Sequence, residues 1–219
     1  MALEPSHVSP VRARIDKVST IYKLKVAARM FTVVSNFIGT FKTGDNINYN
    51  LAWLRLQYAR YAVADDAERT LMRKPMIVAL ISITEAILYD FHRRAKDFRR
   101  EGIATLAEEA LHYIRGKTLE EFEKCIMSAR RHDLFETHSD AFYDQLDELR
   151  KLRNRVHIQN SKRDFEPDEA VAFSADRMAL AEIALERVTK FLSARHPRPG
   201  HTHHVQSFVF PWNEHFPLH

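Results

Sequence analysis

Two arginines, an asparagine and a histidine occur close together near residue 150, and their side-chain types suit one reaction. They are Arg150, Arg153, Asn154 and His157. An imidazole titrates near neutral pH, so His157 can act as a general acid or base. A guanidinium binds phosphate through a bidentate fork and offsets charge in a transition state. With Asn154 orienting either group, this set suits metal-independent RNA cleavage, in which the 2′-hydroxyl attacks the adjacent phosphate.

A helix predicted over residues 140–159 must position these side chains. At about 100° per residue, its apolar residues form one stripe, and Arg153 lies in the middle of that stripe. The stripe consists of Phe142, Leu146, Leu149 and Val156. His157 and Arg150 fall at the edge of the stripe, and Asn154 lies slightly further round the helix. The predicted face therefore presents a permanent cation, an amide and an imidazole together.

The same residues also have a structural interpretation. A guanidinium on a core-facing stripe is rare unless it is paired with a carboxylate or lines a cleft. In this interpretation Arg153 pairs with Glu85 or Asp90 of a preceding helix, and His157 is a structural histidine. Basic residues are common near the C-terminal ends of helices, where they meet the negative end of the dipole, so spacing alone favours this interpretation.

Residues 149–157, with the sequence LRKLRNRVH, resemble the signature helix of the HEPN superfamily. Members of this superfamily are helical bundles, and many are metal-independent ribonucleases. Their motif is an Arg, usually followed by a polar residue such as Asn, and a His a few residues later. The resemblance extends at most over residues 75–195, where a polar loop and a long helix follow the motif.

The resemblance leaves a choice between two arginines. Three residues separate Arg153 from His157, and six separate Arg150 from His157. In the superfamily the commonest separation between Arg and His is longer than that from Arg153, and the longest common separation equals that from Arg150. Arg153 is followed directly by Asn154, as the superfamily pattern prefers. The resemblance therefore implies Arg153 as the catalytic arginine, with Arg150 as the alternative.

The resemblance implies a homodimeric endoribonuclease in which two signature helices meet and both Arg/His sets line one cleft. His157 would be the general acid/base, Arg153 with Arg150 would bind the scissile phosphate, and Asn154 would support them. The product would carry a 2′,3′-cyclic phosphate. The implied partners are RNA, a second copy of the chain, and an antitoxin or activating protein, because toxins and antiphage effectors occur in the superfamily. No cofactor and no metal ion are expected.

Two other functions stay open at this point. The chain could be a non-catalytic HEPN-like module that binds RNA or a protein partner, since some members of the superfamily are inactive. It could also be a purely structural helical protein whose aromatic tail docks on a partner. A basic cluster over residues 93–100 fits an RNA-guiding surface and a solvated helix face equally well.

The composition is that of a globular, mostly helical protein, with 45% hydrophobic and 28% charged residues in a chain of 219. Only 5 Gly occur, and few turn dipeptides, which favours helices over strands. The net charge of +4 is a mild basic excess and does not by itself indicate a nucleic-acid partner. The only cysteine, Cys125, is expected in the core. The absence of an internal disulfide and of a long apolar run predicts a cytoplasmic protein without membrane contact.

We predict an all-α fold, an antiparallel HEPN-like bundle over residues 73–195. A helical extension over 1–72 precedes it, and an irregular tail rich in His, Pro and aromatic residues follows over 196–219. The helices are predicted over residues 15–41, 51–72, 75–100, 103–115, 118–131, 140–159 and 168–195. A turn is predicted over 43–50, where Gly, Asp and Asn cluster.

Three features refine these boundaries. Pro75 is predicted at the start of a helix, where its missing N–H costs nothing. Thr118 and Glu121 have the spacing of a capping box. In the tail, residues 206–210 could form a short strand or a docking segment. Tail histidines, including His201, His203 and His204, could ligate zinc or nickel, with a mobile or packing tail as the default expectation.

Overall fold

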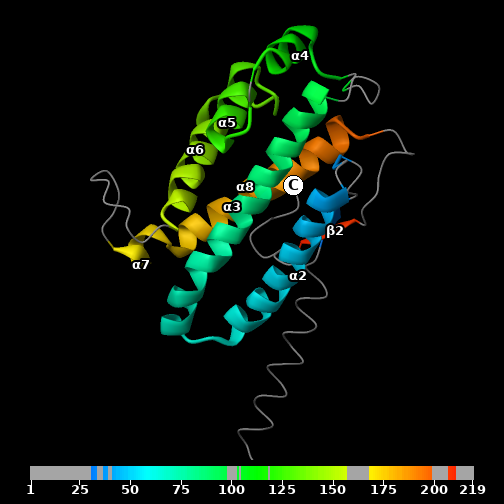
Figure 1. Cartoon of the computed structure of the whole chain (residues 1–219). Coiled ribbons are helices and arrows are strands. Elements are labelled where there is room, and N and C mark those ends of the chain that lie inside the picture. Colours follow the sequence, from blue (N-terminus) through cyan, green and yellow to red (C-terminus); the bar gives the residue numbers. More distant parts are fainter. Residues whose placement is uncertain are drawn as a thin grey trace, which may run out of the picture.

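The computed structural model describes residues 31–33, 37–38, 41–97, 103, 105–117, 119–156, 168–198 and 207–210. Within these residues the chain is mostly helical, with two short strands, which confirms the predicted all-α class. The helices are α2 (Phe41–Val63), α3 (Asp66–Asp97), α4 (Glu108–Arg115), α5 (Phe122–Arg131), α6 (Ala141–Asn154), α7 (Glu169–Ala172) and α8 (Ala175–Arg195). The long helix α3 lies at the centre and contacts α2, α4, α5, α6 and α8 (Figure 1).

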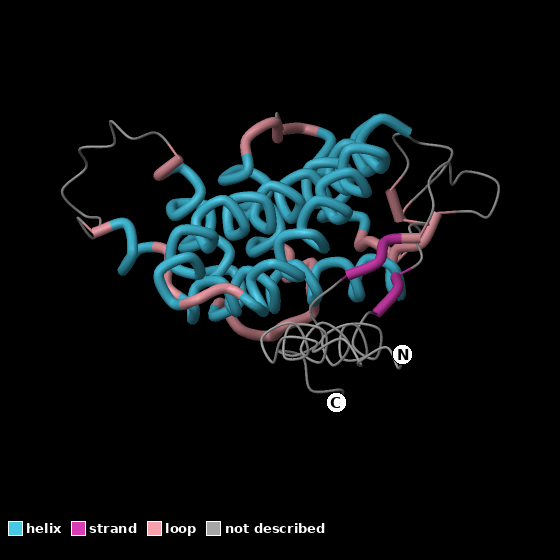
Figure 2. Tube along the Cα trace, turned by 90° about the horizontal axis from the view of Figure 1, so that it is seen from below, coloured by secondary structure: helices cyan, strands magenta, loops and turns pink. Residues whose placement is uncertain are grey.

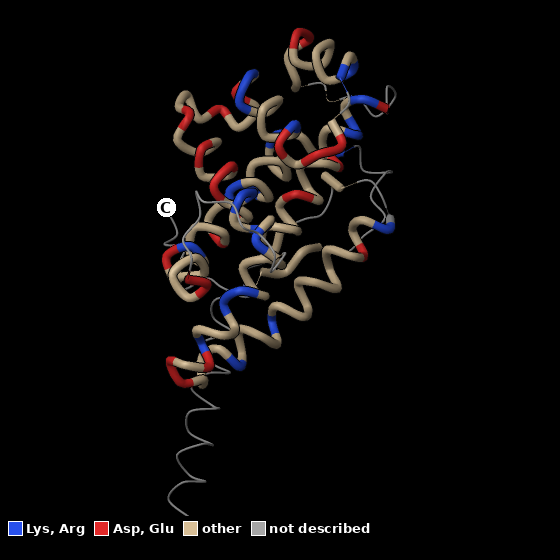
Figure 3. Tube along the Cα trace, turned by 60° about the vertical axis from the view of Figure 1, so that its left-hand side comes forward, with Lys and Arg blue, Asp and Glu red and all other residues tan. Residues whose placement is uncertain are grey.

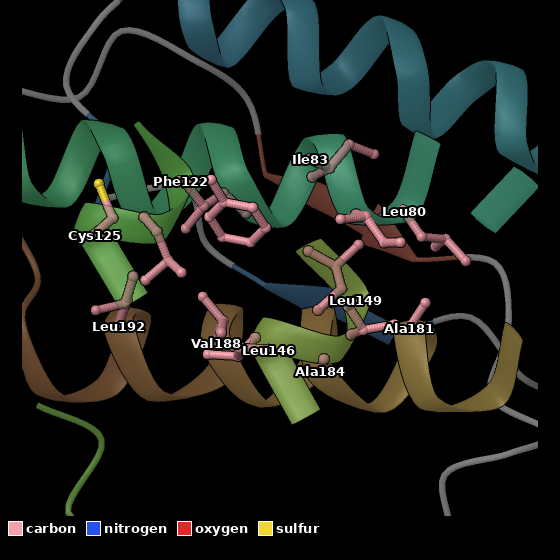
Figure 4. Close-up of a cluster of buried hydrophobic side chains, with 14 of the residues drawn as sticks. Leu80, Ile83, Phe122, Cys125, Leu146, Leu149, Ala181, Ala184, Val188 and Leu192 are labelled. Atoms are coloured by element: carbon pink, nitrogen blue, oxygen red, sulfur yellow. The ribbon is translucent and has the colours of Figure 1, made fainter. Parts of the chain in front are cut away.

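The hydrophobic core lies where α3, α5, α6 and α8 meet (Figure 4). Its buried side chains include Leu80, Ile83, Phe122, Cys125, Leu146, Leu149, Ala181, Ala184, Val188 and Leu192. Burying one Leu or Phe side chain contributes about 1.5–3 kcal/mol, so this shared core fixes α6 against α3 and α8. Burial also confirms the expected core position of Cys125 and raises the pKa of its thiol to about 12.

The predicted apolar stripe of α6 is confirmed in its first three turns and wrong at its end. Phe142, Leu146 and Leu149 are buried, whereas Val156 is 45% exposed. The reason is that α6 ends at Asn154, so Val156 no longer follows the helical period. Residues 157–167, which hold the rest of the predicted helix, lie outside the described part of the chain.

The two strands join segments from opposite ends of the chain. β1 (Phe31–Val33) pairs antiparallel with β2 (Phe208–Phe210), with Val33 opposite Phe208 (Figure 2). Of the two possibilities for residues 206–210, a short strand or a docking segment, the strand is confirmed over Phe208–Phe210, and residue 206 lies outside the described residues. The helix predicted over residues 15–41 is wrong at 31–33, and its first part lies outside the described residues. Phe208 and Phe210 are buried with Val209 between them partly exposed, the alternation of a half-buried strand.

The turn predicted over residues 43–50 is wrong, because α2 begins at Phe41 and continues through this segment. Ile47 is buried, as are Leu51 and Leu54 further along the same face. Asn50 does not cap a helix but donates its amide to the backbone oxygen of Asn46 at 2.8 Å. The free energy of burying these apolar side chains outweighs the turn preference of the local Gly, Asp and Asn residues.

The boundary between the next two helices also differs from the prediction. α2 ends at Val63, and α3 begins at Asp66 and runs through Pro75 without a break. Asp65 Oδ1 accepts a hydrogen bond from the backbone N–H of Glu68 at 2.8 Å, so this aspartate caps the new helix. The boundary expected between residues 72 and 73 falls inside α3.

The shorter helices follow the predicted order with shifted ends. α4 and α5 start later than predicted, and Glu121, with no side-chain cap, is the N-cap of α5. Thr118, the first residue of the predicted capping box, lies outside the described residues. Gly116 is the C-cap of α4. The last predicted helix is divided into α7 and α8, because Ser174 caps α8 by accepting from the N–H of Arg177 at 3.3 Å.

Candidate functional site at the end of α6

The loop before α6 is fixed by one carboxylate. Asp133 accepts hydrogen bonds from the backbone N–H of Thr137 at 2.9 Å, from that of His138 at 2.8 Å and from the Tyr143 hydroxyl at 2.8 Å. Burial would raise the pKa of Asp133, but these hydrogen bonds hold it well below its usual range. In the same loop Asp133, Glu136 and His138 have positive φ, a strained conformation for residues other than glycine. The direction of α6 is therefore set at its N-terminal end.

Arg153 lies in the last turn of α6 and forms an ion pair with Glu85 of α3. The two side chains are 31% and 24% exposed, so the pair lies at the edge of the core with one side open to solvent. Nη1 of Arg153 also lies 3.4 Å from Oδ1 of the exposed Asn154, a weak hydrogen bond. The pairing with Glu85 is the partner that the structural interpretation of Arg153 predicts.

Arg150 lies in a different environment, one turn before Arg153. Its Nε donates to Asp147 at 2.8 Å, and its Nη1 lies 3.4 Å from Glu123 of α5. Lys151 also binds Asp147, at 2.8 Å. Burial would raise the pKa of Asp147, but the hydrogen bonds from Lys151 and Arg150 outweigh burial and lower it. With 16% of its side chain exposed, Arg150 is the less accessible of the two candidate arginines.

Arg155 has a structural role that its sequence position does not predict. It is buried, although the helical projection places it away from the apolar stripe. Its Nη2 lies 3.1 Å from Oε1 of Glu169 in α7, and Glu169 also pairs with Lys74 of α3. The hydrogen bond from Lys74, with a smaller one from Arg155, lowers the pKa of Glu169. This network holds the end of α6 against α3 and α7.

The structure therefore brings together Arg153, Asn154 and Glu85, and keeps Arg150 apart among other carboxylates. His157 lies outside the described residues, which end at Val156 on this side of the loop. Glu85 belongs to this site but lies outside the sequence motif of residues 149–157. The signal that points to it is the position of Arg153 on an apolar stripe, which requires a carboxylate partner.

In the described part of the basic cluster, residues 93–97, the cations do not form one continuous surface. Arg94 is buried and donates to the backbone oxygen of His196 at 2.6 Å and to that of Pro197 at 3.1 Å. Arg93 is exposed and pairs with Asp97 at 3.7 Å. Residues 98–100 lie outside the described part of the chain. Figure 3 shows basic and acidic segments interspersed along the described helices.

Two buried titratable groups lie away from the candidate site. Glu182 of α8 accepts a hydrogen bond from the Tyr58 hydroxyl of α2, and burial raises the pKa of Glu182 to about 8. His92 of α3 is fully enclosed, with Nδ1 2.8 Å from the backbone oxygen of Leu88, and burial lowers its pKa to about 4. Both groups therefore favour their neutral forms near pH 7, which suits a low-polarity core.

A hollow of about 230 Å³ lies between α2 and α3. Ile47 and Ile83 form its apolar part, and Ser82 and Tyr89 belong to its α3 wall. These last two residues are three positions before and four positions after Glu85, so they are its neighbours on the helix surface. Neither Glu85 nor Arg153 lines the hollow, which faces α2, whereas the ion pair joins α3 to α6.

In the described part of the chain, no group of three or more His, Cys, Asp and Glu side chains is placed to hold a metal ion. His201, His203 and His204 lie outside it. No described helix combines the length and the apolar character needed to cross a membrane. Comparisons with protein families, with curated proteins and with solved structures find no match to this chain.

Proposed function

We propose that the chain is a metal-independent endoribonuclease of HEPN type, with its site at the C-terminal end of α6. Arg153 binds the scissile phosphate, Asn154 supports Arg153, and His157 transfers protons. The 2′-hydroxyl attacks the adjacent phosphorus, the bond to the 5′-oxygen breaks, and the products are a 2′,3′-cyclic phosphate and a free 5′-hydroxyl. Roles as a toxin or an antiphage effector, with an antitoxin or an activating protein as partner, belong to the same proposal.

The observation that carries this proposal is the contact set of Arg153. A guanidinium has five N–H donors, and the contacts with Glu85 and Asn154 use only part of them. Glu85 therefore holds the cation in place while leaving donors for a phosphate. A cation that is fixed before substrate binds needs little reorganisation in the transition state, and this is the condition for strong electrostatic catalysis.

The contacts of Arg150 make it the weaker candidate for phosphate binding. Its two ion pairs, with Asp147 and Glu123, place carboxylates on two sides of the guanidinium. A phosphate would have to displace one of these carboxylates or approach both of them. Among the described residues Arg153 has one carboxylate partner, and its exposed fraction is larger, so we assign it the catalytic role and give Arg150 a structural one.

A homodimer through α6 completes the proposed chemistry. The reaction needs a base for the 2′-hydroxyl proton and an acid for the 5′-oxygen. One chain supplies one imidazole at this site, His157, so a second copy would supply the other. Asn154 and Val156 are exposed at the end of α6, where the second copy would contact the first.

A comparison of three single variants tests the assignment. We expect Arg153→Ala to reduce RNA cleavage about 10²–10³-fold, as loss of a transition-state donor does. Arg150→Ala should reduce cleavage much less. Lys151→Ala is the matched control, because this exposed cation lies on the same helix and pairs with Asp147. Equal cleavage by the Arg153→Ala variant and the parent would contradict the assignment.

A second candidate function is a non-catalytic helical module that binds RNA or a protein. The observation that favours it is the Arg153–Glu85 ion pair itself, because a purely structural arginine would make the same contact. The two candidates differ in one measurable outcome. A binding module would leave RNA intact at every enzyme concentration, and Arg153→Ala would change only affinity or stability.

A further inference from the structure

α2 has two apolar faces, and the bundle covers one of them. Ile47 and Leu51 are buried on the side where α2 packs against α3. On the opposite side of the helix Tyr49 is 76% exposed, Leu56 69% and Val63 60%. A helix at the surface of a globular protein normally has one apolar stripe and a polar opposite face. The second apolar face of α2 therefore marks an interaction surface.

The exposed residues have the heptad spacing of two paired helices. Tyr49, Leu56 and Val63 are each seven residues apart, and Ala52 and Ala59 lie three residues after the first two of them. This is the a/d pattern of a coiled coil, with large residues at a and alanine at d. We call these five residues the outer seam of α2. It spans residues 49–63, about 21 Å of helix.

Two arginines flank the outer seam, one on each side. In the heptad that begins at Tyr49, Arg55 falls at position g and Arg60 at position e, and residues 46–64 contain no other charged residue. Both arginines are exposed. Arg60 lies 3.7 Å from Glu68 in a solvent-exposed pair, which contributes little stability, and Arg55 has no carboxylate partner among the described residues. Both flanks of the seam are therefore positive.

We propose that the outer seam of α2 binds an acidic amphipathic helix of another protein. The partner helix would place apolar side chains between the large residues of the seam, and Asp or Glu at its own e and g positions opposite Arg55 and Arg60. α2 is already folded within the bundle, so binding orders the partner alone, and a short seam can suffice. The proposal does not use Arg153 or His157 and is independent of the proposed function.

Charge favours this partner over other parts of the same protein. If the outer seams of two copies paired, an arginine of one copy would face an arginine of the other in either helix orientation. Residues 1–30 are also basic, with Arg12, Arg14, Lys17, Lys23, Lys25 and Arg29 against Glu4 and Asp16. Residues 211–219 contain Pro211 and Pro217, which do not suit a continuous helix.

The alternation of large and small residues favours a helix over a lipid surface. Ala52 and Ala59 leave shallow holes between the larger side chains, and the knobs of a facing helix fill such holes. An anionic membrane would also attract the arginines, but its binding energy follows the apolar area that enters the lipid. The two alanines contribute little of that area.

Fluorescence anisotropy with two labelled synthetic helices tests the proposal on the full chain. Both peptides have 21 residues with Leu at a and d, and one carries Glu and the other Lys at every e and g position, so that each repels its own copies. We expect the Glu helix to bind with a micromolar Kd and the Lys helix to bind about tenfold more weakly or worse. Added salt should reduce this difference. No binding of the Glu helix, or equal binding of both helices, would overturn the proposal.

Surface variants locate the binding site. Leu56→Glu should weaken binding of the Glu helix about tenfold or more, as loss of a central apolar contact does. Arg55→Glu combined with Arg60→Glu should make the Lys helix the tighter ligand. Leu71→Glu is the matched control, because Leu71 is 79% exposed but lies on α3, and it should bind like the parent. Equal losses in Leu56→Glu and Leu71→Glu would overturn the assignment to the outer seam.

Two further measurements give the other occupants a chance to appear. Vesicles of phosphatidylcholine and phosphatidylglycerol that sediment with the parent but not with Leu56→Glu, without binding of the Glu helix, would assign the seam to lipid and overturn the proposal. A dimer of the parent that Leu56→Glu dissociates would assign the seam to a second copy, and this result would also overturn it.

Discussion

Arg153 links α6 to α3 through its ion pair with Glu85, and this contact can serve both stability and chemistry. The pair with Glu85 lies at the edge of the core, where solvent screens it only in part. Its strength decides whether Arg153 is held rigidly enough to bind a phosphate without reorganisation. The sequence predicts this partner in its structural interpretation. A guanidinium on an apolar stripe is rare unless it pairs with a carboxylate or lines a cleft, and Glu85 is one of the two carboxylates considered there.

A double-mutant cycle on this pair measures that strength. We expect Arg153→Ala and Glu85→Ala to show a coupling energy of about 1 kcal/mol, the upper end for ion pairs that solvent reaches. The coupling should decrease with added salt, because one side of the pair is open to solvent. Urea unfolding of the four proteins gives the value. Purely additive effects at low salt would mean that the pair does not hold Arg153.

The buried Glu182 should make the folded chain less stable as pH rises. Its pKa in the folded chain is about 8, above the value near 4.3 of an exposed glutamate. The folded state therefore binds a proton that the unfolded state releases between these values. Stability should fall as pH rises from about 4.5 to about 8, by up to about 1.4 kcal/mol per pH unit.

The Glu182→Gln variant tests this dependence, because its amide cannot lose the proton. We expect the variant to show a flatter stability profile than the parent between pH 5 and pH 8. Unfolding temperatures measured at both pH values provide the comparison. Glu148→Gln is a suitable control, since Glu148 is an exposed glutamate of α6 that pairs with Arg177. Parallel profiles for the parent and Glu182→Gln would show that Glu182 is ionised in the folded state.

α6 is held at both of its ends, and this is what places the candidate site in the fold. Asp133 fixes the loop before it, and the Arg155–Glu169–Lys74 network fixes the segment after it. Core packing of Leu146 and Leu149 fixes its face. The Asp133 contacts join residues near each other in the sequence, and the Lys74–Glu169 contact joins distant ones. Helical periodicity reports neither kind of contact, so the sequence predicts the helix and its buried face but not what anchors it.

The Asp133→Asn variant tests how much the hydrogen bonds of Asp133 stabilise the loop before α6. The amide keeps one acceptor oxygen, and asparagine tolerates positive φ, but the acceptor for the N–H of His138 is lost. We expect a loss of about 1–3 kcal/mol in the free energy of unfolding at pH 7. Asp140→Asn, at an exposed carboxylate before α6, should have a much smaller effect. An equal loss in both variants would contradict the anchoring role.

The pH dependence of Asp133 runs opposite to that of Glu182. Its folded pKa is held below the ordinary value near 3.9, so its contribution is present above that value and disappears as pH falls through the folded pKa. The parent should therefore lose stability below about pH 4, and Asp133→Asn should lose less. Acid titration of the unfolding free energy measures both profiles, and a steeper loss in the variant would be the contrary result.

Helical periodicity predicted the elements that bury one continuous apolar face, such as α6 and the body of α8. It did not predict the start of α2, where Ile47 and Leu51 are buried in spite of local turn residues. It also did not predict that α3 continues through Pro75, because packing along a 32-residue helix outweighs a local breaker. The pairing of β1 with β2 joins distant segments, which single-sequence patterns do not encode.

The whole molecule should act as a dimer if the proposed chemistry is right. The described chain exposes Val156 at the end of α6, where the second copy is proposed to bind. We expect the parent to sediment as a dimer at micromolar concentration and Val156→Arg to weaken that dimer at least tenfold. Met127→Arg is the control, because Met127 is an exposed apolar side chain of another helix, α5. A monomeric parent would contradict the shared cleft.

RNA cleavage in the presence of EDTA, compared between the parent and His157→Ala, tests the proposed chemistry most directly. We expect the parent to cut total RNA without metal and to leave 2′,3′-cyclic phosphate ends. The His157→Ala variant should lose this activity while keeping its fold and dimer, because an alanine cannot transfer the proton. Cleavage by His157→Ala at the parent rate would contradict the proposed acid/base, and cleavage by the parent that EDTA abolishes would contradict the metal-independent mechanism.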